Sequence, residues 1–288
     1  QSSIILGVFG ELKANLQNTT NVYLQHFLGF YMQSNIFSKL KILLNSRRIF
    51  KNWYIYPKIY FKLTNAKSVI FETVTGMKIC IRTDSTDLMA LTNVWMIGEY
   101  NIEDYAIDNN DTVIDIGSHI GLFSLFVYQF CNKGKIFCYE PIRENFEYLD
   151  LNLKLNKTNN IFPFNLAVSS DSSDLDIFLN EDQSGHSIFS KNNKKITVKS
   201  ISLKQIFDEN KILNCKLLKL DCEGSEYQII DALPLNYFDR IENIVIEYHL
   251  ADSKPELGKK LITKIKNTGF KITTRPHHND MGFLIARK

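Results

Sequence analysis

The sequence predicts an α/β fold in which a twisted, mostly parallel β-sheet is covered by helices on both faces. From Asp111 to the end of the chain, short apolar β-branched runs alternate with longer helical patterns. The first of these runs, Thr112–Ile116, leads into a turn that contains glycine. The last two runs are joined by residues 275–280 alone. This connection is too short for a parallel crossover, so we expect the final strand to be antiparallel.

A helical and hairpin extension is expected ahead of the sheet. Apolar residues in Gln17–Arg48 recur at helical spacing and predict two helices with a break near residue 34 or 35. Two runs, 69–74 and 77–82, alternate in polarity around a glycine, which is typical of a β-hairpin. Residues 88–97 are predicted to be helical.

The alternation that follows defines the elements of the sheet domain. A further pair of runs, 175–179 and 196–200, interrupts this alternation and predicts a second hairpin. The predicted strands of the sheet are 112–116, 135–139, 161–168, 215–220, 242–248, 270–274 and 281–286, and the predicted helices are 120–131, 143–156, 202–209, 225–231 and 255–268.

These patterns divide the chain into a basic, aromatic extension (1–67), a hairpin and helix lead-in (68–110) and a sheet domain (111–288). Between Leu12 and Phe71 there are nine lysines and arginines and no acidic residue, although the whole chain carries only +3. Such a segment either contacts an anionic membrane surface or acceptor, or is a solvated helix pair whose aromatic residues pack on the main domain. The small net charge does not indicate a nucleic-acid-binding protein.

Cysteine usage and hydropathy favour a cytoplasmic protein. The five cysteines form no C-x-x-C pair and no zinc-like spacing, which favours buried, reduced thiols. No apolar run reaches the roughly 18 residues that a membrane span requires. Peripheral contact of the basic segment with the inner membrane surface stays open as an alternative.

The stretch Asp111–Gly121, DTVIDIGSHIG, indicates a site for a nucleotide-like cofactor. Gly117 allows a tight turn and Gly121 allows close approach of a ligand, while Glu140 ends the next strand, where a carboxylate can bind both ribose hydroxyls. The middle glycine of the dinucleotide pattern G-x-G-x-x-G is missing. Asp115 would repel a phosphate and suits the ammonium group of S-adenosylmethionine. An ordinary strand–turn–helix without a ligand is the other interpretation.

Five motifs together resemble the FkbM-type family of S-adenosylmethionine-dependent methyltransferases. They are DIGSHIG, YEP, NLAVS, LLKLDCEGSE and IVIEYH, and the resemblance covers roughly Ser68 to Lys288. It implies a Rossmann-like methyltransferase fold with an antiparallel last strand, and methyl transfer, usually to oxygen of sugars or other hydroxylated small molecules. The cofactor-binding residues predicted from the turn chemistry and this resemblance are Asp115, Gly117, Ser118, His119, Gly121, Glu140 and Ala167.

Methyl transfer to a hydroxyl requires alignment and usually a base. Residues at the carboxyl ends of strands are candidates, because ligands bind there in open α/β sheets. Asp221 and Glu223 follow the fourth predicted strand and His249 follows the fifth, and these three are the predicted catalytic residues. The alternatives are a helix cap for the acids, above all for Glu226, and a loop-orienting role for His249.

The string SDLMALTNVWMIGEY resembles the lead-in of the same family. We expect Tyr100 at its end to stack over the cofactor and Glu99 to contact it. The alternative is that both residues only anchor the lead-in to the sheet.

No metal site is predicted. The carboxylates of Asp221, Glu223 and Glu247 suit a divalent cation in principle, but this is the less favoured interpretation. His277 and His278 lack a third ligand.

The predicted activity is O-methylation of a hydroxyl on a glycan or other polyol, with S-adenosylmethionine as cofactor and no nucleic-acid partner. One alternative is a non-catalytic S-adenosylmethionine-binding adaptor at a membrane, but Asp115, Glu140 and Asp221 are all present. Another is a dinucleotide-dependent sugar-modifying enzyme. The missing glycine and the lack of a Tyr-x-x-x-Lys dyad argue against it.

Overall fold

The computed structural model describes residues 36–100, 102–179, 194–276 and 280–288. The chain divides into two compact units, residues 1–44 and 45–288. One described helix, α3 (Ile36–Ile49), crosses this division. The first of the two helices predicted in Gln17–Arg48 lies outside the described residues.

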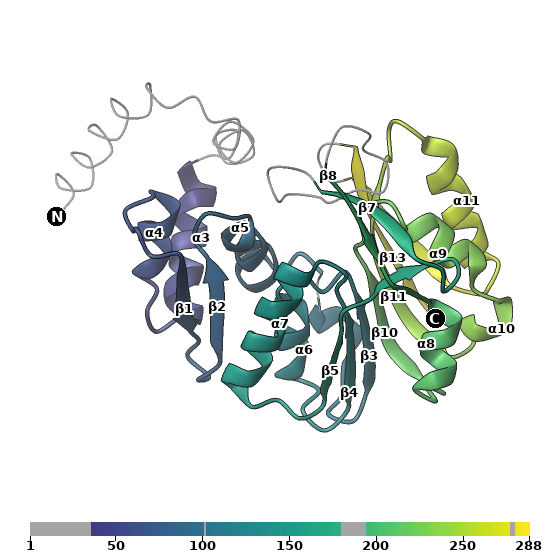
Figure 1. Cartoon of the computed structure of the whole chain (residues 1–288), viewed down its shortest axis with the longest axis horizontal. Helices are drawn as coiled ribbons and strands as arrows, with labels where there is room; N and C mark the ends of the chain where they lie inside the picture. Colours follow the sequence, from purple (N-terminus) through teal and green to yellow (C-terminus); the bar gives the residue numbers. More distant parts are fainter. Residues whose placement is uncertain (1–35, 101, 180–193, 277–279) are drawn as a thin grey trace. The chain divides into compact units, whose positions relative to one another are not determined.

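A seven-stranded sheet forms the centre of the second unit (Figure 1). Its strand order is β12-β13-β11-β10-β3-β4-β5, and β13 is antiparallel to both of its neighbours whereas β10, β11, β3, β4 and β5 pair in parallel. The mostly parallel sheet and the antiparallel last strand are therefore confirmed. The strands are β3 (Thr112–Ile116), β4 (Lys135–Tyr139), β5 (Ile161–Phe164), β10 (Cys215–Leu220), β11 (Ile241–His249), β12 (Lys271–Pro276) and β13 (Met281–Arg287).

Helices cover both faces of this sheet (Figure 1). Ile114 and Ile116 of β3, with Leu218 and Leu220 of β10, belong to the large core on the face of α8, α9 and α11. The residues between them, Asp115 and Lys219, point to the face that carries α6 and α7, because side chains alternate along a strand. The helices are α6 (Leu122–Tyr128), α7 (Arg143–Asn156), α8 (Leu203–Glu209), α9 (Glu226–Ala232), α10 (Leu235–Phe238) and α11 (Pro255–Lys266).

The single strand predicted at 161–168 is wrong, because the chain leaves the sheet after Phe164. The side chain of Asn165 donates to the carbonyls of Glu140 and Pro141 and so redirects the backbone. The next residues form β6 (Ala167–Ser169), which pairs with β9 (Ser200–Ser202) instead. The predicted second hairpin is confirmed as β7 (Leu175–Leu179) and β8 (Lys194–Val198).

The predicted first hairpin is also present, as β1 (Ser68–Glu72) paired antiparallel with β2 (Lys78–Arg82). The helix expected at 88–97 is a short α5 (Asp87–Leu91) followed by a π-helix, Thr92–Ile97, which ends at Gly98 in the left-handed conformation. A 3-10 turn, Ile102–Tyr105, then leads to the sheet.

Aromatic residues of the basic segment pack inside the second unit. Phe50 is fully buried, with its ring centroid 4.9 Å from that of Phe71 and 6.3 Å from that of Trp95. Tyr56 in the short helix α4 (Ile55–Tyr60) shares a hydrogen bond of 2.9 Å with Thr92. The packing alternative therefore holds for these residues, while the domain boundary at residue 67 stays a prediction.

We predict that Gly117→Ala destabilises the protein more than Gly269→Ala. Both glycines have φ between +70° and +90°, so alanine is strained at either position by about 1–2 kcal/mol. At position 117 a Cβ would also lie 1.7 Å from the carbonyl oxygen of Asp221, whereas nothing lies within 4 Å at position 269. Overpacking should add about 1–3 kcal/mol. Urea unfolding measures both losses, and equal losses would contradict the prediction.

Candidate active site

The glycine turn joins the ends of two neighbouring strands. Gly117 follows β3, and its missing Cβ leaves room for the carbonyl of Asp221, which follows β10. The amides of Gly117 and Ser118 both donate to the carbonyl of Tyr139, at 3.0 and 3.1 Å. The turn is thus held against β4 on one side and β10 on the other, at the carboxyl edge of the sheet.

The other turn residues are also engaged within the protein. The Ser118 hydroxyl donates to the Asp115 carbonyl at 2.8 Å. A Cβ on Gly121 would lie 2.5 Å from a methyl of Leu149 in α7, so this glycine makes room for helix packing rather than for a ligand. The cofactor contacts predicted for Ser118 and Gly121 stay predictions.

His119 connects the turn to the lead-in. Its side chain lies 3.4 Å from Asp87 and 3.3 Å from the guanidinium of Arg82. Arg82 is itself buried and binds Asp87 through two side-chain nitrogens, at 2.8 and 2.9 Å. Burial lowers the pKa of His119, which keeps the imidazole neutral beside this ion pair. The lead-in therefore fixes the conformation of the cofactor turn.

Glu140 is placed at the end of β4, as predicted. One carboxylate oxygen accepts from the His119 amide and the other from the Ile142 amide, each at 2.9 Å. Burial is the main cause that raises the pKa of Glu140, to about 7. The oxygen bound to Ile142 also accepts a longer bond of 3.4 Å from the Asn145 side chain, whereas the oxygen bound to His119 retains a second lone pair with capacity for a ribose hydroxyl.

A buried ion pair lies beneath the turn. Asp115 is fully buried, accepts from the Ser124 hydroxyl at 2.6 Å, and lies 3.1 Å from the ammonium of Lys219. Lys219 also donates to the Gly117 carbonyl at 2.8 Å and lies 3.7 Å from Asp221. Asp115 thus neutralises Lys219, and its contact with a cofactor ammonium stays a prediction.

Glu99 and Tyr100 reach the same edge of the sheet. The Tyr100 hydroxyl donates to Asp221 at 2.9 Å, and its ring packs edge-on against Phe123 and Phe283. Burial and the nearby charge of Asp221 raise the pKa of Glu99 to about 7. Tyr100 positions Asp221 in this structure, whereas its predicted stacking on the cofactor stays a prediction.

His249 is held between two carboxylates. Its Nδ1 lies 3.2 Å from Glu226, and its Nε2 lies 3.1 Å from Glu223. Burial alone would lower the pKa of His249, but Glu226 and Glu223 outweigh it and raise the pKa to about 11. A raised pKa favours the protonated imidazole and suits a positioning role better than that of a base, and the predicted catalytic role of His249 stays a prediction.

Glu226 is a cap, as the structural alternative proposed. It is fully buried, and its carboxylate accepts from the amides of Cys222 and Gly224 at 2.9 Å. Glu223 adopts a φ of +55°, which directs its side chain back toward His249. Asp221 and Glu223 therefore lie at the carboxyl edge with His249, as predicted.

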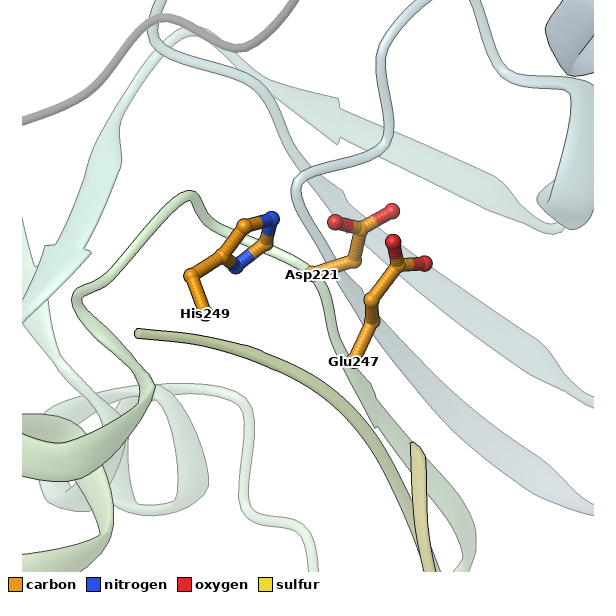
Figure 2. Close-up of side chains that lie close together, drawn as sticks. All are labelled: Asp221, Glu247 and His249. Atoms are coloured by element: carbon orange, nitrogen blue, oxygen red, sulfur yellow. The ribbon is translucent and has the colours of Figure 1, made fainter. Parts of the chain in front are cut away.

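Figure 2 shows Asp221, Glu247 and His249 close together at the ends of β10 and β11. One ligand atom from each of the three lies within 4.8 Å of the others. Burial, Asp221 and Glu99 raise the pKa of Glu247 well above its ordinary value. This cluster differs from the set considered from the sequence, because His249 takes the place of Glu223. His277 and His278 lie outside the described residues.

Sequence reasoning missed Lys219 and Arg82 as parts of the site. The signal for Lys219 was a lone charge within the apolar run LLKL, since a charge in a buried strand requires a partner. No sequence pattern linked Arg82 to the glycine turn, because its contact there, His119, lies 37 residues further along the chain. Ala167 is buried in β6, and its cofactor contact stays a prediction.

The residues present fit S-adenosylmethionine. The cofactor has ribose hydroxyls that donate hydrogen bonds, and a sulfonium and an ammonium that favour negative surroundings. Glu140 offers acceptor capacity at the end of β4. Asp221, Glu99 and Glu247 place carboxyl groups beside the turn, and a bound cation would favour the ionised forms of Glu99 and Glu247, whose pKa values are raised without it. When bound, the cofactor supplies the reactive methyl group on its sulfonium.

The sheet order, the reversed last strand and the acids at the carboxyl edge define a Rossmann-like methyltransferase. A model of the methyltransferase FkbM domain matches residues 115–272, more than half of the sequence, and the chain belongs to this family. Its cofactor is S-adenosylmethionine.

Curated relatives are methyltransferases of low sequence identity. Methyltransferase 1 of Beauveria bassiana is 23% identical over 203 residues, which cover 61% of this chain and 80% of that protein. The hexuronic acid methyltransferase AglP of Haloferax volcanii is 22% identical over 208 residues, 70% of this chain and 83% of that protein. Precorrin-6y C5,15-methyltransferase from Geobacter metallireducens has a TM-score of 0.44 at 12% identity, covering 67% of this chain and 88% of that chain.

We predict that cofactor affinity rises by roughly tenfold between pH 6 and pH 8. Ribose hydroxyls donate to the ionised form of Glu140, and a group with a pKa of about 7 goes from about one tenth to about nine tenths ionised over this range. Calorimetry with S-adenosylhomocysteine measures the affinity. The rise should vanish in Glu140→Gln and persist in Glu99→Gln. If Glu99→Gln abolishes it instead, Glu140 is not the group that titrates.

Proposed function

We propose that this protein transfers a methyl group from S-adenosylmethionine to a hydroxyl of a glycan or other polyol. The observation that carries the proposal is the position of Asp221: its backbone contacts the glycine turn, and its carboxylate accepts from Tyr100 at the carboxyl edge of the sheet. The relative named as a hexuronic acid methyltransferase supports a sugar acceptor.

The side chains suit an in-line displacement at a hydroxyl oxygen. Asp221 is partly exposed and is anchored by Tyr100, so its free oxygen can accept the acceptor's hydrogen bond. Glu223 is also partly exposed and lies beside Asp221 in the chain. As the oxygen attacks the methyl carbon, one of these two carboxylates receives the hydroxyl proton. Positioning of the hydroxyl against the methyl carbon supplies the remainder of the rate acceleration.

His249 supports this chemistry as a cation. Its imidazolium is bound on both sides by Glu223 and Glu226, so it orients Glu223 and offsets negative charge near the acceptor. The adaptor alternative gains no support, because Glu140, Asp221 and Glu223 all lie at the carboxyl edge. The dinucleotide alternative lacks a place for pyrophosphate, since the Gly117, Ser118 and His119 amides are already hydrogen-bonded within the protein.

We predict that Asp221→Asn lowers turnover by about 10²–10⁴-fold, the range for a lost proton acceptor. Cofactor affinity should change little, because the loss belongs to the transition state. Single-turnover methylation of a uronic-acid oligosaccharide and calorimetry with S-adenosylhomocysteine measure the two quantities. Asp231→Asn, at an exposed ion pair with Lys260, is the matched control. Full activity in both Asp221→Asn and Glu223→Gln would refute a carboxylate base.

A peripheral contact with the inner surface of an anionic membrane is proposed for the basic segment. Tyr54 and Leu63 are 53% and 67% exposed, with Lys58 over the Tyr54 ring and Lys62 exposed nearby in sequence. Exposed apolar groups among lysines suit a lipid headgroup layer. Within the described residues, no helix has the length and apolar character to cross a membrane.

Replacement of Lys58 and Lys62 by Gln should weaken binding to phosphatidylglycerol vesicles by about 2 kcal/mol, since each lysine near the surface contributes about 1 kcal/mol. Vesicle co-sedimentation measures the affinity. Replacing the exposed pair Lys259 and Lys266 of α11 in the same way should have no effect. Equal binding to neutral phosphatidylcholine vesicles would show that charge attraction is not the cause.

A further inference from the structure

We propose that Asp221, Glu247 and His249 form a binding site for a divalent transition-metal ion such as Mn²⁺ or Zn²⁺. Their ligand atoms lie within 4.8 Å of one another (Figure 2). Ligands about 2.0–2.2 Å from one metal ion lie roughly 3–4 Å apart. Small side-chain rotations therefore bring the three into coordination.

The strand register presets this arrangement. Leu220 of β10 lies opposite Ile246 of β11, so the residues that follow them, Asp221 and Glu247, are neighbours across the sheet edge. His249 is two residues beyond Glu247 and so faces the same side. The ligands thus come from adjacent strand ends, which hold them more firmly than a surface loop would.

Residues outside the ligand set orient the ligands. The buried carboxylate of Glu226 lies 3.2 Å from Nδ1 of His249, so Nε2 is the nitrogen that would coordinate the ion, in exchange for its 3.1 Å contact with Glu223. A carboxylate on the far nitrogen of a histidine is the usual arrangement at metal sites. Tyr100 donates to one oxygen of Asp221 and leaves the other oxygen available.

The cluster of carboxyl groups around the site suits a cation. Glu99, Glu223 and Glu247 surround Asp221, while Lys219 is already bound to Asp115 and to the Gly117 carbonyl. In the described part of the chain, no hydrogen bond or ion pair reaches the carboxylate of Glu247. A proton and a metal ion compete for Nε2 of His249, and the same carboxylates stabilise the doubly charged ion more strongly.

The ligand types select the class of metal. An imidazole with two carboxylates suits Mn²⁺, Fe²⁺ or Zn²⁺ better than Ca²⁺ or Mg²⁺, which prefer oxygen ligands alone. Three protein ligands leave positions for water or substrate. If the proposed function holds, on which this role rests, an open position next to Asp221 receives the acceptor hydroxyl and lowers its pKa. Glu223 is then the carboxylate that takes the proton.

The test is Mn²⁺ titration of the full chain after dialysis against a chelator, followed by calorimetry and by electron paramagnetic resonance. We expect one Mn²⁺ per chain. Glu247→Gln and His249→Gln should each lower the affinity at least tenfold, and Glu226→Gln should lower it by about 10–100-fold through the lost orientation of His249. Glu242→Gln, at the opposite end of β11 and paired with Lys216, is the matched control and should bind normally.

Gln has the size of Glu and resembles the neutral acid that the raised pKa of Glu247 favours, so this variant should fold, and circular dichroism checks it. Absence of Mn²⁺ and Zn²⁺ binding below about 1 mM, or equal affinity in wild type and Glu247→Gln, would overturn the metal site. Methylation without metal binding overturns this inference alone. Metal binding by a protein that methylates no hydroxyl supports the site and removes the proposed function instead.

Discussion

The contact on which the site depends is the one between Lys219 and the groups around its ammonium. Burial disfavours the charged amine, but Asp115 and Asp221 outweigh this and hold the pKa of Lys219 above its ordinary value. The Lys219 ammonium contacts the carboxylate of Asp115 in β3, the carbonyl of Gly117 and the carboxylate of Asp221 after β10. It thereby fixes these three groups relative to one another. Removal of one partner would leave an uncompensated buried charge, which typically costs about 3–5 kcal/mol. The cofactor turn and the candidate catalytic acid are therefore one structural unit.

Several further carboxyl groups lie at the same edge of the sheet as this buried ion pair. Glu99 and Glu247 lie near enough to Asp221 that their pKa values are raised, by burial first and by mutual repulsion next. Protonation relieves this repulsion, and a bound cation relieves it with the carboxylates ionised. The sulfonium and ammonium of S-adenosylmethionine, a divalent metal ion, or both would offset it here. The negative edge thus favours cationic ligands and disfavours phosphate, in agreement with the missing middle glycine of the dinucleotide pattern.

A structural feature was predictable from the sequence where residues close together in the chain determine it, and was not where distant residues do. The strands from Thr112–Ile116 to Met281–Arg287 were predictable because buried parallel strands are continuous apolar runs, and the reversed last strand followed from a short connection. The end of the strand at Phe164 was not predictable, because it depends on hydrogen bonds from the Asn165 side chain to the carbonyls of Glu140 and Pro141, which follow β4. Motif order located Asp221, Glu223 and His249, but not their protonation. The raised pKa of His249 depends on its contact with Glu226, a residue that the sequence pattern alone identifies only as a helix cap.

The lead-in contributes more to the site than its place before the first motif suggests. Arg82 and Asp87 bind each other and contact His119 of the cofactor turn, while Tyr100 anchors Asp221 from the same stretch of chain. The hairpin also joins α7, because Asn152 bonds both the amide and the carbonyl of Cys80 and the carbonyl of Ile120. Ordering the cofactor turn therefore requires the lead-in to be folded. Cofactor binding should in turn stabilise the lead-in, because linkage between the two is reciprocal.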